Sequence, residues 1–340
     1  MTTSPQPIAT ALLAYGMSGK VFHAPFLHTH PGFELKAVWE RNQAKAHLDY
    51  PQIESYPELT ELLKDESLEL VVVNTPNFTH FDLAQQALQA GKHVLIEKPV
   101  TSRSQEYLQL LDLAKSVNKQ VFVYQNRRWS SDICAAKKQI ESGKLGDIIE
   151  MHLRFDRYRP EIGPKGFKEN PVPSSGIGYD LGAHLLDQAI SIFGKPKLIS
   201  KYKNSFRTHT QVDDYFQVHL QFQEKISVFI TASLLVAEPQ KGIVIHGTKG
   251  SFSKPFCDTQ ENQLIAGLLP TDPEYGKENP EDIGILCYYD EAGNKQCENV
   301  AGEIGDFNAL FTAVYESIRL GKAYPIRDEE ILWQLQILES

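Results

Sequence analysis

The first 125 residues alternate short apolar runs with amphipathic stretches. Ile8 to Tyr15 and Phe33 to Glu40 have the composition of buried strands. Leu68 to Thr75, with the sequence LELVVVNT, is rich in β-branched residues and too short to favour a helix. His93 to Glu97 and Val121 to Gln125 continue the series. The pattern predicts strands that are buried on both faces, as in a parallel sheet.

Amphipathic segments between these runs predict helices. Asn77 is a suitable N-cap for a helix over Phe78 to Ala90, and Gly91 is a suitable residue to end it. A further helix is predicted over Ser104 to Val117. Alternation of strands and helices in this way indicates a doubly wound parallel sheet with right-handed crossovers.

The pattern changes after residue 125. A strong helix is predicted over Gly178 to Phe193, and the runs FQVHLQF, ISVFITASLLV and GIVIHG between Lys197 and Phe252 predict a mostly antiparallel sheet. Leu269 to Gly284 is rich in Pro, Gly, Asp and Glu and predicts a surface loop. Helices are predicted again over Gly305 to Leu320 and Glu329 to Leu338.

We therefore expect an α/β protein with two domains, residues 1–125 and residues 126–340, with the final helix able to pack back on the first domain. A chain of 340 residues exceeds one typical core, and its 41 % hydrophobic and 23 % charged residues are typical of globular proteins. The net charge of −9 argues against non-specific nucleic-acid binding, which depends on clustered Lys and Arg.

The four cysteines, Cys134, Cys257, Cys287 and Cys297, form no Cys-x-x-Cys pair and no dense cluster with histidine. A disulfide framework or a metal site is therefore not expected, and a reducing compartment fits best. The N-terminus shows no signal-peptide pattern, and no apolar run approaches the roughly 18 residues of a membrane-spanning helix. We expect a cytoplasmic protein with no membrane partner.

A glycine-rich turn follows the first predicted strand, with the sequence Ala14-Tyr15-Gly16-Met17-Ser18-Gly19. It matches the dinucleotide-binding fingerprint except that alanine replaces the first glycine. Gly16 would let the backbone approach a pyrophosphate, and Gly19 would let the next helix pack on the sheet. Amides at that helix N-terminus would bind phosphate oxygens. Pro25 predicts that this helix is short or broken near Phe22.

Glu40 ends the second predicted strand, where an acidic residue typically accepts hydrogen bonds from the adenosine ribose. A solvated carboxylate at a strand end is the alternative interpretation. The guanidinium of Arg41 could stack on adenine or pair with a 2′-phosphate. Because Glu40 would repel that phosphate, the sequence favours NAD and leaves NADP open.

Lys98 follows the strand His93 to Glu97, at the sheet edge where doubly wound folds bind ligands. A lysine there can stabilise developing alkoxide charge, and Pro99 raises the chance of a cis peptide that would aim the side chain inward. An ordinary surface lysine is the alternative.

Asp180 and His184 are four residues apart in the predicted helix, so they share one face, away from an apolar stripe of Leu186, Ala189, Ile190 and Phe193. Such a pair suits proton abstraction from an alcohol. A helix-capping aspartate and a structural histidine are the alternatives. Gly182 within a helix costs roughly 1 kcal/mol relative to alanine, which indicates a close approach there.

Five segments together resemble the glucose–fructose oxidoreductase/inositol dehydrogenase (Gfo/Idh/MocA) family, over about residues 8 to 335. They are AYGMSGKVFHAPFL, NTPNFTHFDLAQQALQAGKHVLIEKPVT, YQNRRW, FDRYRP and GIGYDLGAHLLDQAISIFG. The likeness is greatest to the bacterial subgroup that includes NADP-dependent scyllo-inositol dehydrogenases. Ala14 and Glu40 depart from the pattern of that subgroup, and Glu40 puts its cofactor preference in doubt here.

The resemblance implies an N-terminal Rossmann domain and a C-terminal α/β domain with a large open sheet that mediates a homodimer or homotetramer. It implies that His184 is the general acid/base, Asp180 its partner and a substrate ligand, and Lys98 a charge-stabilising substrate ligand. Tyr158 and Arg159 are implied substrate contacts. Cofactor contacts are expected from the turn, the strand ends and the following loops, at Gly16, Met17, Ser18, Gly19, Glu40, Arg41, Thr75, Pro76, Asn77, His80, Glu97, Lys98, Asn126 and Trp129.

The expected function is hydride transfer between a nicotinamide cofactor and a secondary alcohol of a polyol, inositol or sugar-like substrate, without a metal. Two alternatives remain open. One is another redox substrate on the same scaffold, such as a dihydrodiol or an unsaturated compound. The other is a non-catalytic protein that senses NAD(P).

Overall fold

A computed structural model describes residues 6–41, 43–164 and 166–340. The chain folds into two compact units. The first contains the described residues up to Gln125, together with Glu261–Tyr275 and Phe307–Arg327. The second contains Asn126–Gln260, Gly276–Asp306 and Asp328–Ser340.

The core of the first unit is a six-stranded parallel sheet in the order β3-β2-β1-β4-β5-β6. Its central strands are buried on both faces, as all four residues of β4 show, and this explains why the sequence of this strand is a continuous apolar run. The strands are β1 (Ile8–Leu12), β2 (Phe33–Trp39), β3 (Glu54–Tyr56), β4 (Leu70–Val73), β5 (His93–Glu97) and β6 (Val121–Tyr124).

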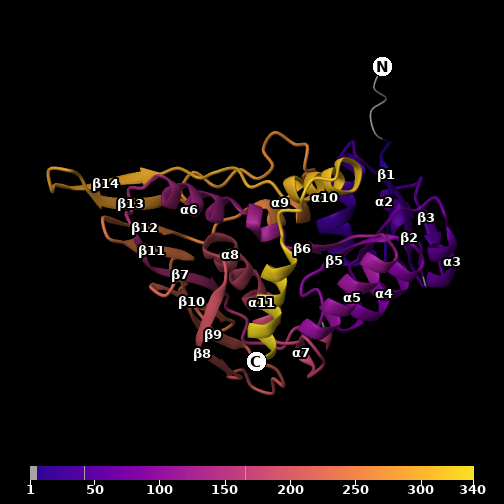
Figure 1. The fold of residues 1–340 in the computed structure, drawn as a ribbon, viewed down its shortest axis with the longest axis horizontal. Coiled ribbons are helices and arrows are strands. Elements are labelled where there is room, and N and C mark those ends of the chain that lie inside the picture. Colours follow the sequence, from indigo (N-terminus) through magenta and orange to yellow (C-terminus); the bar gives the residue numbers. More distant parts are fainter. Residues whose placement is uncertain (1–5, 42, 165) are drawn as a thin grey trace. The chain divides into compact units, whose positions relative to one another are not determined.

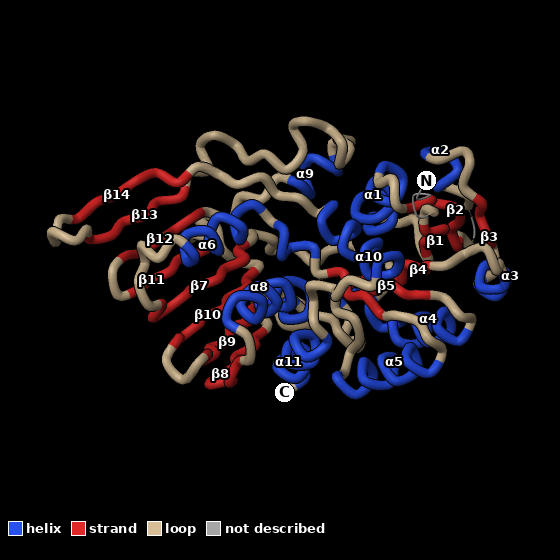
Figure 2. The backbone as a smooth tube through the Cα atoms, turned by 45° about the horizontal axis from the view of Figure 1, so that its top comes forward, coloured by secondary structure: helices blue, strands red, loops and turns tan. Residues whose placement is uncertain are grey.

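Helices cover both faces of this sheet. In Figure 2, α4 and α5 lie side by side on one face, and α1 and α10 lie on the other. Gly91, at φ +75°, ends α4 as predicted. The α-helices of this unit are α1 (Ala24–Thr29), α2 (Ala46–Asp49), α3 (Leu59–Lys64), α4 (His80–Gln89), α5 (Ser104–Ser116) and α10 (Asn308–Leu320).

One predicted helix start in the first unit differs from the structure. Residues Asn77–Thr79 form a 3₁₀ turn, and α4 begins at His80 after Thr79. Pro25 predicted that the helix after the glycine turn is short or broken near Phe22, and in the structure α1 is short and the helix changes type at His23, where φ is −126°. A π-helical segment, Ser18–His23, leads directly into α1, and Pro25 lies in the first turn of α1, where its missing N–H costs no hydrogen bond.

The second unit is built on an eight-stranded, mostly antiparallel sheet in the order β14-β13-β12-β11-β7-β10-β9-β8, in which only the β7–β10 pair is parallel within the described residues. The β13–β14 hairpin extends beyond the other strands (Figure 1). The strands are β7 (Ile148–Asp156), β8 (Pro196–Asn204), β9 (Tyr215–Phe222), β10 (Ile226–Ser233), β11 (Ile243–Gly247), β12 (Gly250–Lys254), β13 (Gly284–Tyr289) and β14 (Lys295–Val300).

One face of this sheet is covered by α6 and α8, and α11 packs on α8. The final helix is therefore part of the second unit, whereas α10 belongs to the first. The predicted helix over Gly178 to Phe193 begins as a π-helical turn, Gly178–Gly182. The α-helices of this unit are α6 (Ser131–Glu141), α7 (Gly166–Glu169), α8 (Ala183–Phe193) and α11 (Asp328–Glu339). A further short helix, α9 (Gln260–Ile265), lies where the chain passes from the second unit to the first.

The sequence analysis expected no disulfide framework, but the structure contains a disulfide in the second unit. Cys287 on β13 and Cys297 on β14 are directly paired across the hairpin and are joined by a disulfide. A separation of ten residues does not by itself show that two cysteines face each other, because this depends on the hairpin register. Cys134 and Cys257 are free thiols. No helix in the described part of the chain is long and apolar enough to cross a bilayer.

Candidate active site

A cavity of about 480 Å³ lies at the carboxyl ends of β1, β2 and β4 in the first unit. This edge is where doubly wound sheets bind ligands. Five of the predicted cofactor residues line it, namely Gly16, Glu40, Arg41, Thr75 and Pro76. The remaining lining residues are Leu13, Ala14, Tyr15, Trp39, Gln43 and Lys45.

The two glycines of the turn have different surroundings. A side chain at Gly16 would project into open space, so the backbone here is accessible to a ligand. A Cβ at Gly19 would collide with the carbonyl of Ala14 and the side chain of Asn74, because the π-helical segment packs tightly on the strand ends. The predicted roles of the two glycines therefore fit the local geometry of a dinucleotide site.

Asn74, which the sequence analysis missed, holds the turn in place. Its Oδ1 accepts a hydrogen bond from the amide of Ala14 at 3.1 Å, and its Nδ2 donates to the carbonyl of Ala14 at 2.8 Å. Asn74 is 5 % exposed. A polar residue at the end of the apolar run LVVV was the signal that could have revealed it.

The Glu40 carboxylate is turned toward the start of α2. It accepts hydrogen bonds from the amide of Lys45 at 3.0 Å, from the amide of Ala46 at 3.1 Å and from the hydroxyl of Ser55 at 3.3 Å. Glu40 thus fixes the loop that forms one wall of the cavity, in addition to placing a negative charge there. The Arg41 guanidinium lies 5.8 Å from the centre of the Trp39 ring. Lys45 is exposed on the same loop.

Polar groups also surround the start of the π-helical segment. Met17 is 42 % exposed. The hydroxyl of Tyr15 donates to Asp49 at 2.8 Å, and Lys20 pairs with the same carboxylate oxygen at 2.7 Å. Burial, together with the negative charge of Asp49, raises the pKa of the Tyr15 phenol far above its ordinary value. This tyrosine therefore stays protonated and is not a candidate base.

Glu97 is the last residue of β5, and Lys98 and Pro99 follow it at the same sheet edge. The Lys98–Pro99 peptide bond is cis. The Glu97 carboxylate accepts hydrogen bonds from Ser18 Oγ at 2.7 Å and from the Lys98 amide at 3.2 Å, and it contacts His23 Nε2 at 2.9 Å. Burial favours the protonated form of Glu97, but hydrogen bonds from His23 and Ser18 outweigh it and hold the pKa below its usual value.

His80 is fully buried at the start of α4. Its Nδ1 lies 2.8 Å from the carbonyl oxygen of Pro99, and its Nε2 lies 2.9 Å from that of Thr75. Burial lowers the pKa of His80. His80 was predicted to contact the cofactor, but it connects two loops and does not line the cavity. Asn77, the other predicted residue of this segment, lies in the preceding 3₁₀ turn.

In the second unit, Asp180 and His184 lie on adjoining helical turns. Asp180 is in the π-helical turn and pairs with Lys168 at 2.6 Å, whereas His184 is in the first turn of α8. Asp180 is partly exposed and His184 is 7 % exposed. The imidazole is thus more enclosed than the helix pattern indicated. Lys168, in the short helix α7, is a neighbour of the predicted site that sequence reasoning missed.

The structure explains the glycines of this turn by packing. A Cβ at Gly182 would lie 2.7 Å from the ring of Phe216 on β9, so the expected close approach is made by a core side chain. Asp213 accepts a hydrogen bond from the amide of Gly178 at 2.8 Å and fixes the beginning of the turn. Glycine here permits the π-helical turn to lie directly on the sheet.

Asn126 and Trp129 lie in a 3₁₀ turn that is anchored to α8 and α11. Arg128 binds both carboxylate oxygens of Asp187 at 2.8 Å and one oxygen of Glu330 at 2.7 Å. Asp187 is three residues after His184 on the same helix. The ion-pair network therefore fixes this turn against the helix that carries the candidate base. Sequence reasoning assigned no role to any of the three members, although the motif RRW, the segment DLGAHLLDQ and the final helix contained them.

Tyr158 and Arg159 lie after β7. Tyr158 is 62 % exposed and forms an isolated bridge with Leu235, and the amide of Arg159 donates to the carbonyl of Leu234 at 2.7 Å. Their predicted contact with substrate stays a prediction. No cluster of three or more His, Cys, Asp or Glu that could hold a metal occurs among the described residues.

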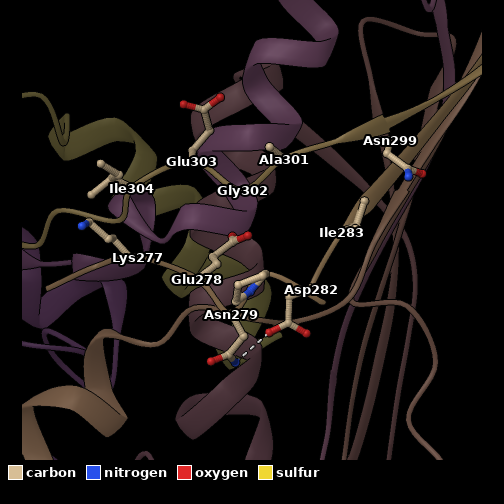
Figure 3. A pocket seen from close by; sticks show the side chains of 11 residues that line it. Lys277, Glu278, Asn279, Asp282, Ile283, Asn299, Ala301, Gly302, Glu303 and Ile304 are labelled. Atoms are coloured by element: carbon tan, nitrogen blue, oxygen red, sulfur yellow. Dashed lines mark hydrogen bonds between the residues drawn. The ribbon is translucent and has the colours of Figure 1, made fainter. Parts of the chain in front are cut away.

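A second cavity of about 480 Å³ lies in the second unit between the segments that flank the β13–β14 hairpin (Figure 3). None of the predicted site residues lines it. Glu278 in its wall pairs with the buried Lys254 at 2.7 Å and accepts a hydrogen bond from Cys257 at 3.2 Å. Its lining residues are Lys277, Glu278, Asn279, Pro280, Asp282, Ile283, Asn299, Ala301, Gly302, Glu303 and Ile304.

Both parts of the chain match models of known protein domains. Residues 8–125 match the oxidoreductase family with an NAD-binding Rossmann fold, and residues 133–253 match the GFO/IDH/MocA C-terminal domain. An uncharacterised oxidoreductase of Schizosaccharomyces pombe is 37 % identical, covering 98 % of this chain and 96 % of that protein.

A bacterial sequence and a solved bacterial structure are similar over the same length. The scyllo-inositol 2-dehydrogenase (NADP(+)) IolW of Bacillus subtilis is 33 % identical, covering 98 % of this chain and 92 % of that protein. The solved structure of YvaA from Bacillus subtilis matches with a TM-score of 0.92 at 33 % identity, over 98 % of this chain and 94 % of that one.

Proposed function

Because this chain belongs to the Gfo/Idh/MocA family of oxidoreductases, we propose that it interconverts a secondary alcohol of a polyol, inositol or sugar-like substrate and the corresponding ketone. The family assignment includes an NAD-binding Rossmann domain. The likeness to a scyllo-inositol dehydrogenase supports a cyclic polyol as the first substrate to test.

The observation that carries the proposal is the sheet edge of the first unit. A cavity lies there beside Gly16, and the space around that residue is open. Lys98 follows β5 at the same edge of the sheet. A dinucleotide fits this arrangement because its pyrophosphate would meet the amides of Gly16 to Gly19 and its adenosine would lie against Glu40 and Arg41. When bound, the nicotinamide ring supplies a hydride acceptor or donor at its C4 atom.

The residues of the chain supply the proton chemistry. In the oxidative direction His184 takes the hydroxyl proton, and the alcohol carbon loses a hydride as the ketone forms. The Lys98 ammonium stabilises the negative charge that develops on the alcohol oxygen. Asp180 stabilises the protonated imidazole and accepts a hydrogen bond from substrate. Lys168 is its observed partner in this structure, so substrate binding replaces or shares that interaction.

The test is turnover on a panel of scyllo-inositol, myo-inositol, D-glucose, glucose 6-phosphate and a dihydrodiol, each with NAD and with NADP. In His184→Ala and Lys98→Ala we expect turnover to fall by about 10²- to 10⁴-fold, while binding of NADH or NADPH, whichever supports turnover, is retained in a fluorescence titration. His246→Ala and Lys115→Ala are matched controls, because both residues are exposed elsewhere in the respective unit.

Near-normal turnover in both site variants would contradict the assignment of the catalytic residues. Turnover of the dihydrodiol alone would redirect the proposal to that substrate class. Cofactor binding without turnover of any member would favour a sensor of NAD(P). The homodimer or homotetramer and the cytoplasmic location stay predictions, and sedimentation velocity measures the first.

A further inference from the structure

Two buried histidines hold the segment that carries Lys98. His23, in the π-helical segment, and His80, at the start of α4, both have no exposed surface. The first contacts the carboxylate of Glu97, and the second contacts the carbonyl oxygen of Pro99. The two sequence neighbours of Lys98, Glu97 and Pro99, are therefore each in contact with a histidine.

The contact of His23 with Glu97 has a defined direction. Glu97 is ionised, because its pKa lies below the usual value, so its carboxylate can only accept hydrogen bonds. The proton therefore lies on His23 Nε2, which donates to Glu97 Oε1 at 2.9 Å. The other carboxylate oxygen accepts the backbone amide of Lys98 at 3.2 Å. His23 is thus connected to the Lys98 backbone through one carboxylate.

The His23 ring cannot easily change its position. It packs against Tyr124 at 4.4 Å between ring centres and against Phe311 at 6.1 Å. Its Nδ1 is buried and has no hydrogen-bond partner among the described residues. Burying an unsatisfied polar atom is unfavourable, so an apolar side chain would serve packing better. The cost is explained if the Nε2 hydrogen bond has a function.

His80 makes a corresponding connection on the other side. Both of its partners, the carbonyl oxygens of Pro99 and Thr75, are acceptors. In either protonation state the ring therefore donates at least one hydrogen bond to these loops. Burial lowers the pKa of His80, while the charge of Glu97 favours the protonated ring and that of Lys98 opposes it. The ring lies between the loop after β4 and the cis peptide after Lys98.

We propose that His23 and His80 are positioning residues that hold Lys98 in the orientation needed to stabilise charge on the substrate oxygen. His23 acts through Glu97, and His80 acts through Pro99. Because Ser18 donates to the same Glu97 oxygen at 2.7 Å, the phosphate-binding turn and the Lys98 segment form one hydrogen-bonded unit. This inference rests on the proposed function, since it assigns a purpose to the placement of Lys98.

A double-mutant cycle between His23 and Lys98 tests the inference. The variants are His23→Phe, which fills a similar volume without the donor, Lys98→Met, and the combination of both. Initial rates are measured with scyllo-inositol and NADP, or with whichever pair from the substrate panel is turned over. Binding of the corresponding reduced cofactor, NADH or NADPH, to the free enzyme is measured by fluorescence titration. Misplacement of a catalytic group by about 1 Å can cost 10²-fold in rate.

We expect His23→Phe to lower kcat by about 10- to 100-fold in the wild-type background and by less than about twofold in the Lys98→Met background, because residues that act through each other are not additive. The affinity for that reduced cofactor should change by less than about threefold. His23→Gln, which retains an amide donor, should recover part of the rate. Tyr124→Phe is the matched control: it removes a hydroxyl that donates to the carbonyl of Phe22, and it keeps the ring that packs against His23.

Equal losses from His23→Phe in both backgrounds, or a loss as large in Tyr124→Phe, would overturn the positioning role. If His23→Phe does not fold, His23→Gln and His80→Gln are put through the same cycle and must show the same dependence on Lys98. Failure of the proposed function is distinguishable, since the wild-type chain would then turn over no member of the substrate panel, or Lys98→Met would retain near-normal turnover on its own.

Discussion

Removal of the positive charge at Arg128 should destabilise the second unit strongly. Its guanidinium makes three hydrogen bonds of 2.7–2.8 Å to Asp187 and Glu330, and the three side chains are 7 %, 3 % and 6 % exposed. In Arg128→Met, both carboxylates would remain buried without a cation. Loss of one partner from a buried ion pair costs about 3–5 kcal/mol, and we expect the free energy of unfolding near pH 8 to fall by that amount.

The loss should depend on pH in a direction that the structure fixes. Burial raises the pKa of Asp187 even though Arg128 lowers it. Without Arg128 this pKa rises further, so the folded variant binds more protons than the unfolded chain between the two pKa values. The stability contributed by these carboxyl groups therefore falls as the pH rises through that window. We expect the deficit of Arg128→Met to be smaller near pH 5 than near pH 8.

Urea denaturation followed by circular dichroism measures both effects, with the slope of the transition as a check that the same surface unfolds. Lys138→Met is the matched control, because Lys138 pairs with Glu303 at 2.6 Å with side chains 65 % and 32 % exposed, and such surface pairs contribute about 0–1 kcal/mol. Replacing Arg128, Asp187 and Glu330 together by apolar residues should restore stability. A deficit below about 1 kcal/mol for Arg128→Met, or one that grows toward low pH, would refute the reasoning.

Two further predictions concern Glu40 and Asp132. Glu40→Ser and Glu40→Gln should both raise the NADP-to-NAD ratio of kcat/KM in steady-state kinetics, because both remove the charge that repels a 2′-phosphate. An unchanged ratio would mean that Glu40 only fixes the loop through Lys45 and Ala46. Burial and the nearby Asp258 raise the pKa of Asp132 from 3.8 to about 7. The free energy of unfolding that depends on this group therefore falls as the pH rises between these two values. Above them it no longer changes with pH. Asp132→Asn should therefore be stabilised relative to wild type near pH 8 and much less so near pH 4 in urea denaturation. An equal gain at both pH values would indicate a packing effect.

The parallel sheet could be predicted because the apolar residues that form each strand are adjacent in the sequence. Strands buried on both faces require continuous apolar runs, and β5 matches the predicted range His93–Glu97. The cis bond before Pro99 was also anticipated, since proline is the residue that tolerates it. In the second unit, the alternation of apolar residues predicted a mostly antiparallel sheet, although not the parallel β7–β10 pair. Paired residues of these two strands, such as Glu150 and Ser227, are 77 positions apart in the sequence.

The side-chain network of the candidate site was much less visible. Asn74 and Ala14 are 60 residues apart, and Arg128 and Glu330 are 202 residues apart, so no local pattern connects them. Glu40 was recognised by position, but the orientation of its carboxylate depends on where the loop before Ala46 returns. The disulfide was missed for the same reason. Residue type indicates which chemistry is available, whereas partners are decided by long-range folding.

The first unit is assembled from three separate stretches of chain, and the backbone passes from one unit to the other five times, after residues 125, 260, 275, 306 and 327. No single cut can therefore release a self-sufficient cofactor module. A fragment ending at Gln125 would lack Phe311, which stacks on Phe26 at 4.8 Å, and Tyr324, which hydrogen-bonds the carbonyl of Val123. Exchange of the cofactor module of this chain for that of a relative would therefore have to transplant all three stretches at once.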